Sequence, residues 1–67
     1  MSHKVGAIVF IVRRVSRFLI TVEEGMLVSS DDAQICYSRD GVVGYAAVEN
    51  CFGTRAEAEA KKKTLEE

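Results

Sequence analysis

Three arginines, Arg13, Arg14 and Arg17, lie close together in the N-terminal quarter of this 67-residue chain. Guanidinium groups present several N–H donors in one plane, so they can bind phosphates in a bidentate manner or reach base edges in a groove. Residues 1–17 contain no acid, although the net charge of the whole chain is −1. The sequence therefore allows a local basic site, with Arg39 as a fourth contributor, on a chain that does not attract nucleic acid as a whole. The simpler interpretation is a solvated turn that offsets an acidic remainder.

Other residues with useful chemistry are few. The single histidine, His3, lies beside the N-terminus, and neither Cys36 nor Cys51 has a histidine near it in sequence to act as its base. Asp31 and Asp32 could bind a hard cation, but two adjacent carboxylates in a polar loop are usually only solvated. The glycine spacing fits neither a dinucleotide-binding loop nor a P-loop. We therefore predict no enzyme activity, no catalytic residue, no metal and no cofactor.

The two cysteines are too few for a disulfide scaffold and, with one histidine, too few for a zinc site. Reduced thiols packed as small apolar side chains are the expected state, which favours a cytoplasmic protein. The longest apolar run, residues 5–12, is far shorter than the roughly 20 residues of a membrane-spanning helix. Arg13 and Arg14 end this run and no small-residue cleavage site follows, so a signal peptide is not expected. No membrane partner is predicted.

The length predicts a single small domain over residues 1–67. A chain of this size buries only about 60% of its unfolded surface, so its stability margin is thin. An apolar fraction of 48% is nevertheless sufficient for a folded domain. Oligomerisation would let such a chain bury more surface.

Two strands are expected in the N-terminal half. Residues 5–12 are β-branched and aromatic, and both alternating faces are apolar, so this strand is either covered on both sides or uses one face for a partner chain. A turn over residues 13–17 leads to a second strand at 18–22, and a tight turn follows at 23–25, where Gly25 supplies a positive φ. Residues 26–28 either extend this strand or form their own.

The C-terminal half predicts a hairpin and a helix. Residues 33–38 alternate in polarity, Asp40–Gly41 is a two-residue turn signal, and the returning strand covers residues 42–48. This register places Cys36 opposite Tyr45 and away from Cys51. Thr54 and Glu57 have the spacing of a capping box, which begins a helix that ends near Leu65.

The order of elements predicts an α+β fold: a small antiparallel β-meander of three or four strands, followed by one C-terminal helix packed on the sheet. The apolar side of this helix is only a narrow alanine stripe, so one helix cannot cover the whole sheet. The first strand then needs a second cover, and Ile8, Phe10 and Val12 are the candidate partner or dimer interface. The strands contain no proline and few charges, so the sheet edges are open to pairing. A homodimer is predicted.

The segment from Tyr37 through Asp40–Gly41 to Phe52, Thr54, Glu57 and Ala58 resembles the arm-type DNA-binding domains at the N-termini of some tyrosine integrases. Those domains combine a three-stranded sheet with a helix, and the resemblance covers under half of the chain. They carry several basic residues on the sheet, whereas residues 42–48 carry none. The resemblance implies DNA binding as an expectation.

Two functions therefore follow from the sequence. The first is a small non-enzymatic binding, inhibitory or accessory module that acts through protein–protein contacts as a homodimer. The alternative is a nucleic-acid-binding domain that uses the turn with Arg13, Arg14 and Arg17.

Overall fold

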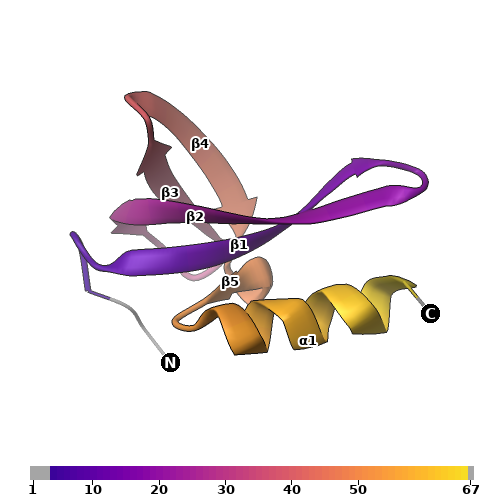
Figure 1. The fold of residues 1–67 in the computed structure, drawn as a ribbon. Helices are drawn as coiled ribbons and strands as arrows, with labels where there is room; N and C mark the ends of the chain where they lie inside the picture. Colours follow the sequence, from indigo (N-terminus) through magenta and orange to yellow (C-terminus); the bar gives the residue numbers. More distant parts are fainter. Residues whose placement is uncertain (1–3, 67) are drawn as a thin grey trace.

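The computed structural model describes residues 4–66, which form one five-stranded antiparallel sheet and one long helix (Figure 1). The elements are β1 (Ile8–Ser16), β2 (Leu19–Ser30), β3 (Gln34–Arg39), β4 (Val42–Ala47), the 3-10 turn η1 (Val48–Asn50), β5 (Cys51–Phe52) and α1 (Arg55–Glu66). The strand order is β4-β3-β2-β1-β5, so the first four strands form a meander and β5 returns to the free side of β1. The predicted α+β fold, a meander followed by a C-terminal helix packed on the sheet, is confirmed.

The first hairpin differs from the prediction in the position of its turn. β1 continues through Arg13 and Arg14 to Ser16, so the expected turn over residues 13–17 is wrong. Only Arg17 and Phe18 connect the two strands. The arginines therefore lie mostly on a strand, where alternation sends neighbouring side chains to opposite faces.

The tight turn expected at residues 23–25 is also wrong. β2 passes through this segment without a break and pairs Gly25 with Val9 of β1, and residues 26–28 extend the same strand. A Cβ atom on Gly25 would lie 2.8 Å from the Tyr37 ring. This glycine therefore allows a close approach of Tyr37 and does not serve a turn.

The second hairpin has the predicted register. Asp40 and Gly41 have φ values of 51° and 80°, which are the left-handed conformations that a type I′ turn requires. The turn places Arg39 opposite Val42 and, further along, Cys36 opposite Tyr45.

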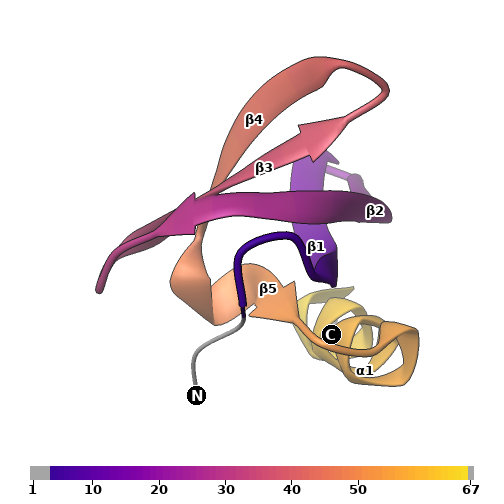
Figure 2. The same cartoon turned by 90° about the vertical axis from the view of Figure 1, so that its left-hand side faces the viewer.

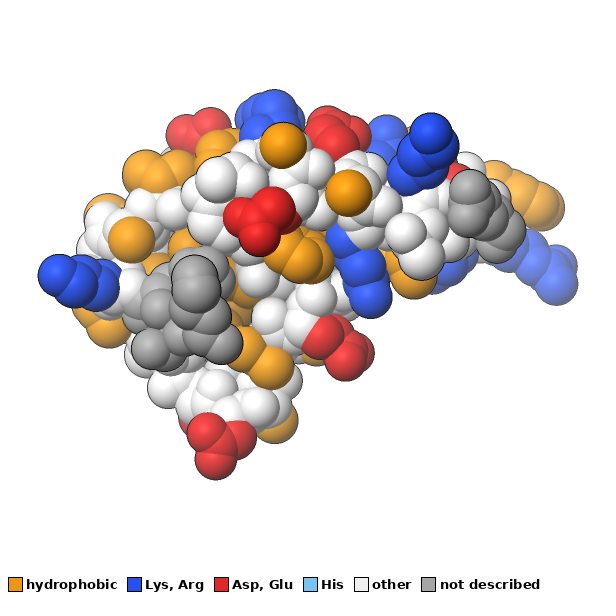
Figure 3. Space-filling model, turned by 90° about the horizontal axis from the view of Figure 1, so that it is seen from below, with side chains coloured by type: hydrophobic (Ala, Val, Ile, Leu, Met, Phe, Trp, Pro, Cys, Tyr) orange, Lys and Arg blue, Asp and Glu red, His pale blue; other side chains and the backbone are white. Residues whose placement is uncertain are grey.

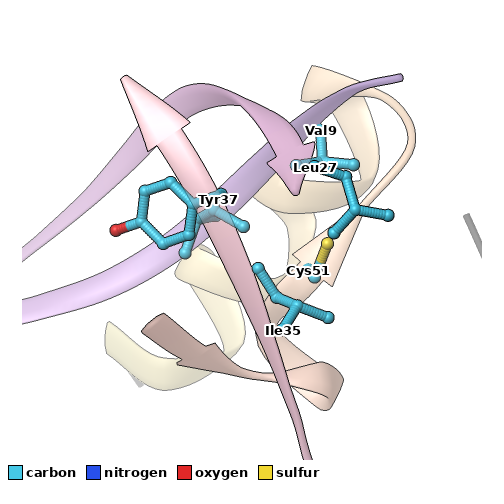
Figure 4. Close-up of a cluster of buried hydrophobic side chains, with 6 residues drawn as sticks. Val9, Leu27, Ile35, Tyr37 and Cys51 are labelled. Atoms are coloured by element: carbon cyan, nitrogen blue, oxygen red, sulfur yellow. The ribbon is translucent and has the colours of Figure 1, made fainter. Parts of the chain in front are cut away.

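The sheet curls strongly, so that β3 and β4 bend over the inner side of β1 (Figures 1 and 2). We call the side inside the curl the inner face and the opposite side the outer face. The inner face holds the larger buried cluster, which consists of Val9, Ile11, Leu27, Ile35, Tyr37 and Cys51 (Figure 4). Curling therefore closes the inner face with the chain's own strands.

The helix α1 covers part of the outer face. Val12 of β1 and Ile20 of β2 pack with Ala58, which is the buried residue of α1. The Arg55 guanidinium lies 5.1 Å from the centre of the Phe10 ring, a cation–π distance. The narrow apolar stripe of α1 thus covers β1, β2 and β5 and leaves the rest of the outer face bare.

The helix begins with the predicted cap. The Glu57 N–H donates to Thr54 Oγ1 at 3.3 Å. In a full capping box the Glu57 carboxylate would accept from the Thr54 backbone N–H. Here it accepts from the Thr54 hydroxyl at 2.9 Å. These bonds fix the point at which the chain leaves β5 and turns onto the outer face.

Candidate functional site

The structure does not bring the four predicted nucleic-acid arginines together. Arg13 and Arg39 lie on the inner face, where both contact the Glu23 carboxylate at 3.6 Å and 3.4 Å. The Glu23 side chain is only 16% exposed. One carboxylate on the inner face therefore forms ion pairs with two of the four arginines.

Arg14 and Arg17 lie instead at the tip of the β1–β2 hairpin, where an Arg14 N–H donates to the Arg17 carbonyl at 3.3 Å. Phe18 completes this tip and is 93% exposed. The tip extends past the other strands, at the same end of the molecule as the C-terminus of α1 (Figure 1). Most of the Lys and Arg side chains on the face drawn in Figure 3 lie toward that end.

The three interface candidates on the first strand have different surroundings, although all lie on the outer face. Val12 is 3% exposed, because α1 covers it. Phe10 is half-buried beneath the Arg55 side chain, and Ile8 is exposed. The bare part of this strand is therefore reduced to Ile8.

The larger bare surface lies further along the sheet and was missed by the sequence reasoning. Ile8 is opposite Met26, Met26 is opposite Ser38, and Ser38 is opposite Val43, so these side chains form one row across four strands. Tyr45 lies beside Val43 on the same face. We call Ile8, Met26, Val43 and Tyr45 the outer row; their exposed fractions range from 45% to 67%. The predicted register together with the narrow helix stripe could have located it.

The strand β4 forms one end of the sheet, and its six residues include neither a charge nor a proline. The residues that flank a two-residue turn, Arg39 and Val42, form a hydrogen-bonded pair, and such pairs alternate along an antiparallel ladder. The N–H and C=O groups of Val43, Tyr45 and Ala47 therefore point away from β3. No strand within residues 4–66 pairs with that side.

A cleft of about 260 Å³ separates β1 from β4. Its lining includes Ile11, Tyr37 and Gly44. A Cβ atom on Gly44 would lie 3.0 Å from the Tyr37 ring, so the ring occupies the space that a side chain would need. The Tyr37 hydroxyl points away from the other labelled core side chains (Figure 4). The cleft is thus closed at its base by an aromatic ring and opens toward solvent.

The acidic loop has a structural explanation. Asp31 Oδ1 accepts the N–H groups of Ala33 at 2.7 Å and Gln34 at 2.8 Å. These bonds, that of Gln34 first, lower the pKa of the Asp31 carboxyl, because they stabilise its charged form. Within residues 4–66 no three His, Cys, Asp or Glu side chains are grouped so that they could hold a metal ion. Asp31 therefore holds the connection between β2 and β3.

Both cysteines are buried and unbridged, in agreement with the prediction of packed thiols. Burial raises the pKa of the Cys51 thiol, so this thiol is a poor nucleophile at neutral pH. Cys36 lies opposite the exposed Tyr45 on the outer face.

The fold and these surfaces define a small α+β domain with an open β4 edge. In the part of the chain that the structure covers, no helix has the length and apolar character needed to cross a membrane. Comparisons with protein-family models, with curated proteins and with solved structures give no match to this chain.

Proposed function

We propose that this chain is a small non-enzymatic binding module, cytoplasmic as the sequence predicts, that accepts a strand of another polypeptide along the outer side of β4. The observation that carries the proposal is the uncharged edge strand, whose Val43, Tyr45 and Ala47 direct backbone donors and acceptors outward. Strand addition uses such main-chain groups for affinity and alternate side chains for specificity.

The surroundings of the edge support this mode of binding. Val43 and Tyr45 are exposed on the outer face, and Val42 is exposed on the inner side of the same strand. An added strand would contact these side chains alternately and would extend the outer row. Folded proteins commonly protect a free edge with a lysine, a proline, a bulge or a very short strand. The two-residue β5 follows this rule at the other end of the sheet, and β4 does not.

The replacement Val43→Pro tests the proposal. It removes an outward N–H that the ladder to β3 does not use, and proline is tolerated on the outer side of an edge strand. Proteins that co-purify with the tagged wild-type chain would be identified, purified and titrated against both forms. We expect Val43→Pro to abolish binding while the circular dichroism spectrum is retained.

Val15→Ala is the matched control, because it removes an exposed apolar side chain from the β1–β2 hairpin, away from β4. This variant should bind as the wild type does. Equal binding by the Val43→Pro protein would contradict the proposal.

A second candidate function, nucleic-acid binding, is favoured by the exposed Phe18 beside Arg14 and Arg17 at the hairpin tip. A narrow two-stranded ribbon fits the major groove of duplex DNA, arginines bind phosphates, and exposed aromatic rings stack on bases or wedge between them. The test is a titration of labelled duplex DNA and RNA at low and moderate salt. Affinity should fall steeply with salt if this candidate is correct.

The ion pairs of Arg13 and Arg39 with Glu23 provide a control for that titration. Replacing Arg14 and Arg17 with alanine should remove binding, whereas replacing Arg13 and Arg39 should change it little, since both already contact Glu23. Titrations without a signal for the wild-type chain would reject this candidate and leave the β4 proposal unaffected.

A further inference from the structure

We infer that the strand accepted by β4 is the β4 strand of a second copy of this chain, paired antiparallel about a two-fold axis at Tyr45. This inference rests on the proposed function, because it names the occupant of the edge proposed above. The two sheets would join into one continuous sheet, with the outer rows of both copies on the same face.

The register follows from which backbone groups point outward. A two-fold axis perpendicular to the sheet keeps each copy's outer face on the same side, and outward-pointing residues must then face outward-pointing residues. Five centres bring outward residues of β4 together, namely each residue from Val43 to Ala47. Centring on Ala46 places Val43 opposite Glu49 of η1, and centring on Ala47 places Tyr45 opposite that same residue, which is outside strand geometry. The choice among the other three centres depends on how many of the outward groups find a partner.

Only the register centred on Tyr45 pairs all three outward residues within strand geometry. Tyr45 then faces Tyr45 of the second copy, and Val43 faces Ala47 on either side of the axis. Centring on Gly44 places Ala47 opposite Gly41, which is in the turn with a φ of 80°. Centring on Val43 places Tyr45 opposite that same glycine and leaves Ala47 beyond the turn. Buried backbone donors and acceptors require partners, so the Tyr45 register is favoured.

The occupant is a second copy because β4 is complementary to itself. Pairing an uncharged strand with its own copy places no like charges of β4 opposite each other. The nearest charges along the chain, Asp40 and Glu49, lie beyond the two ends of β4. Arg13 and Arg14 line the cleft on the β1 side. The axis brings together two exposed tyrosine rings, and aromatic pairs across strands are favourable. The residues of β4 itself offer a charged partner segment no complementary charge.

The test exploits the position of residue 45 on the axis. The chains Tyr45→Glu and Tyr45→Lys each place like charges opposite each other in a homodimer, so each should self-associate at least about tenfold more weakly than the wild type. An equimolar mixture places Glu opposite Lys, and should recover association to within roughly a few-fold of the wild type. Sedimentation equilibrium measures all four samples.

Amide hydrogen exchange supplies the second measurement. As the wild-type concentration rises, the N–H groups of Val43, Tyr45 and Ala47 should become protected. The N–H groups of Val42 and Gly44 already bond to β3 and should not change. Protection confined to the outward set supports the inference.

Three results would overturn the inference. A wild-type chain that stays monomeric up to about 1 mM rejects the second copy. A dimer without protection at Val43, Tyr45 and Ala47 uses another surface. A mixture no tighter than either variant alone rejects the Tyr45 axis. The proposed function survives any of these if a different purified protein protects the same three amides, and it fails if none does.

Discussion

On the outer face of the sheet, α1 covers the half formed by β1, the first part of β2 and β5, whereas the half formed by the later part of β2 with β3 and β4 is bare (Figures 1 and 2). Both halves carry apolar side chains on alternate positions of their strands. Val12 in the first half is 3% exposed, while Tyr45 in the second is 67% exposed. Apolar side chains with the same alternation are therefore buried in the core in one half and exposed for binding in the other. Substitutions in the covered half should change stability, and those in the bare half should change association.

The largest expected effect is at Ala58, where α1 meets the sheet. Ala58→Asp would place a carboxylate among Val12 and Ile20, with no partner for its charge. An uncompensated buried charge costs about 3–5 kcal/mol, which is comparable to the whole stability of a domain of this size. We expect this variant to be largely unfolded by circular dichroism at 25 °C.

Ala56→Asp is the control, because it makes the same replacement on the exposed side of α1 near its N-terminus. A carboxylate is favourable there, so stability should change by less than about 0.5 kcal/mol. If the two variants were equally stable, α1 would not be the cover of this half.

A smaller effect separates Val12 from Val43, two valines on the outer face that differ in burial. Val12→Ala removes two buried methyl groups and should lower the free energy of unfolding by about 2 kcal/mol. Val43→Ala should change the free energy of unfolding by no more than about 0.5 kcal/mol, because the Val43 side chain is exposed in the monomer. Urea unfolding at low protein concentration measures both. A similar loss for the two valines would show that the bare half is covered within the single chain.

The sequence locates the local features of both halves. Asp40 and Gly41 adopt left-handed conformations that few other residue pairs allow, so the turn and its register could be predicted. Thr54 and Glu57 are three residues apart and cap the helix by direct contact. In each case the residues from which the turn or the cap is predicted are the same residues that form it.

The turn at Arg17 and Phe18 could not be predicted in the same way, because neither residue is typical of turns. The glycine that suggested a turn, Gly25, serves a contact with Tyr37 on a neighbouring strand. That contact depends on how the sheet curls, which no local pattern specifies. The curl closes the inner face with the chain's own strands, whereas on the outer face α1 covers Val12 and leaves Ile8, Met26 and β4 bare.

The smallest predicted effect concerns Asp31, which shapes the connection between β2 and β3 at the margin of the bare half. Its carboxylate accepts two backbone N–H groups only in the folded chain, so its pKa lies below the ordinary value. The stabilisation is therefore present above the pKa of an unfolded aspartate, about 3.9, and is lost as the pH falls through the lower folded value.

Asp31→Asn keeps an acceptor oxygen but not the charge. Its urea midpoint should lie below that of the wild type at pH 7, and the two midpoints should converge near pH 2. Asp32→Asn is the control, since Asp32 accepts no hydrogen bond within residues 4–66, and should leave the midpoint unchanged at both pH values. If the urea midpoint of Asp31→Asn stayed as far below that of the wild type at pH 2 as at pH 7, the Asp31 side chain would stabilise the turn through its shape. Its charge would then contribute nothing to the stability of the bare half.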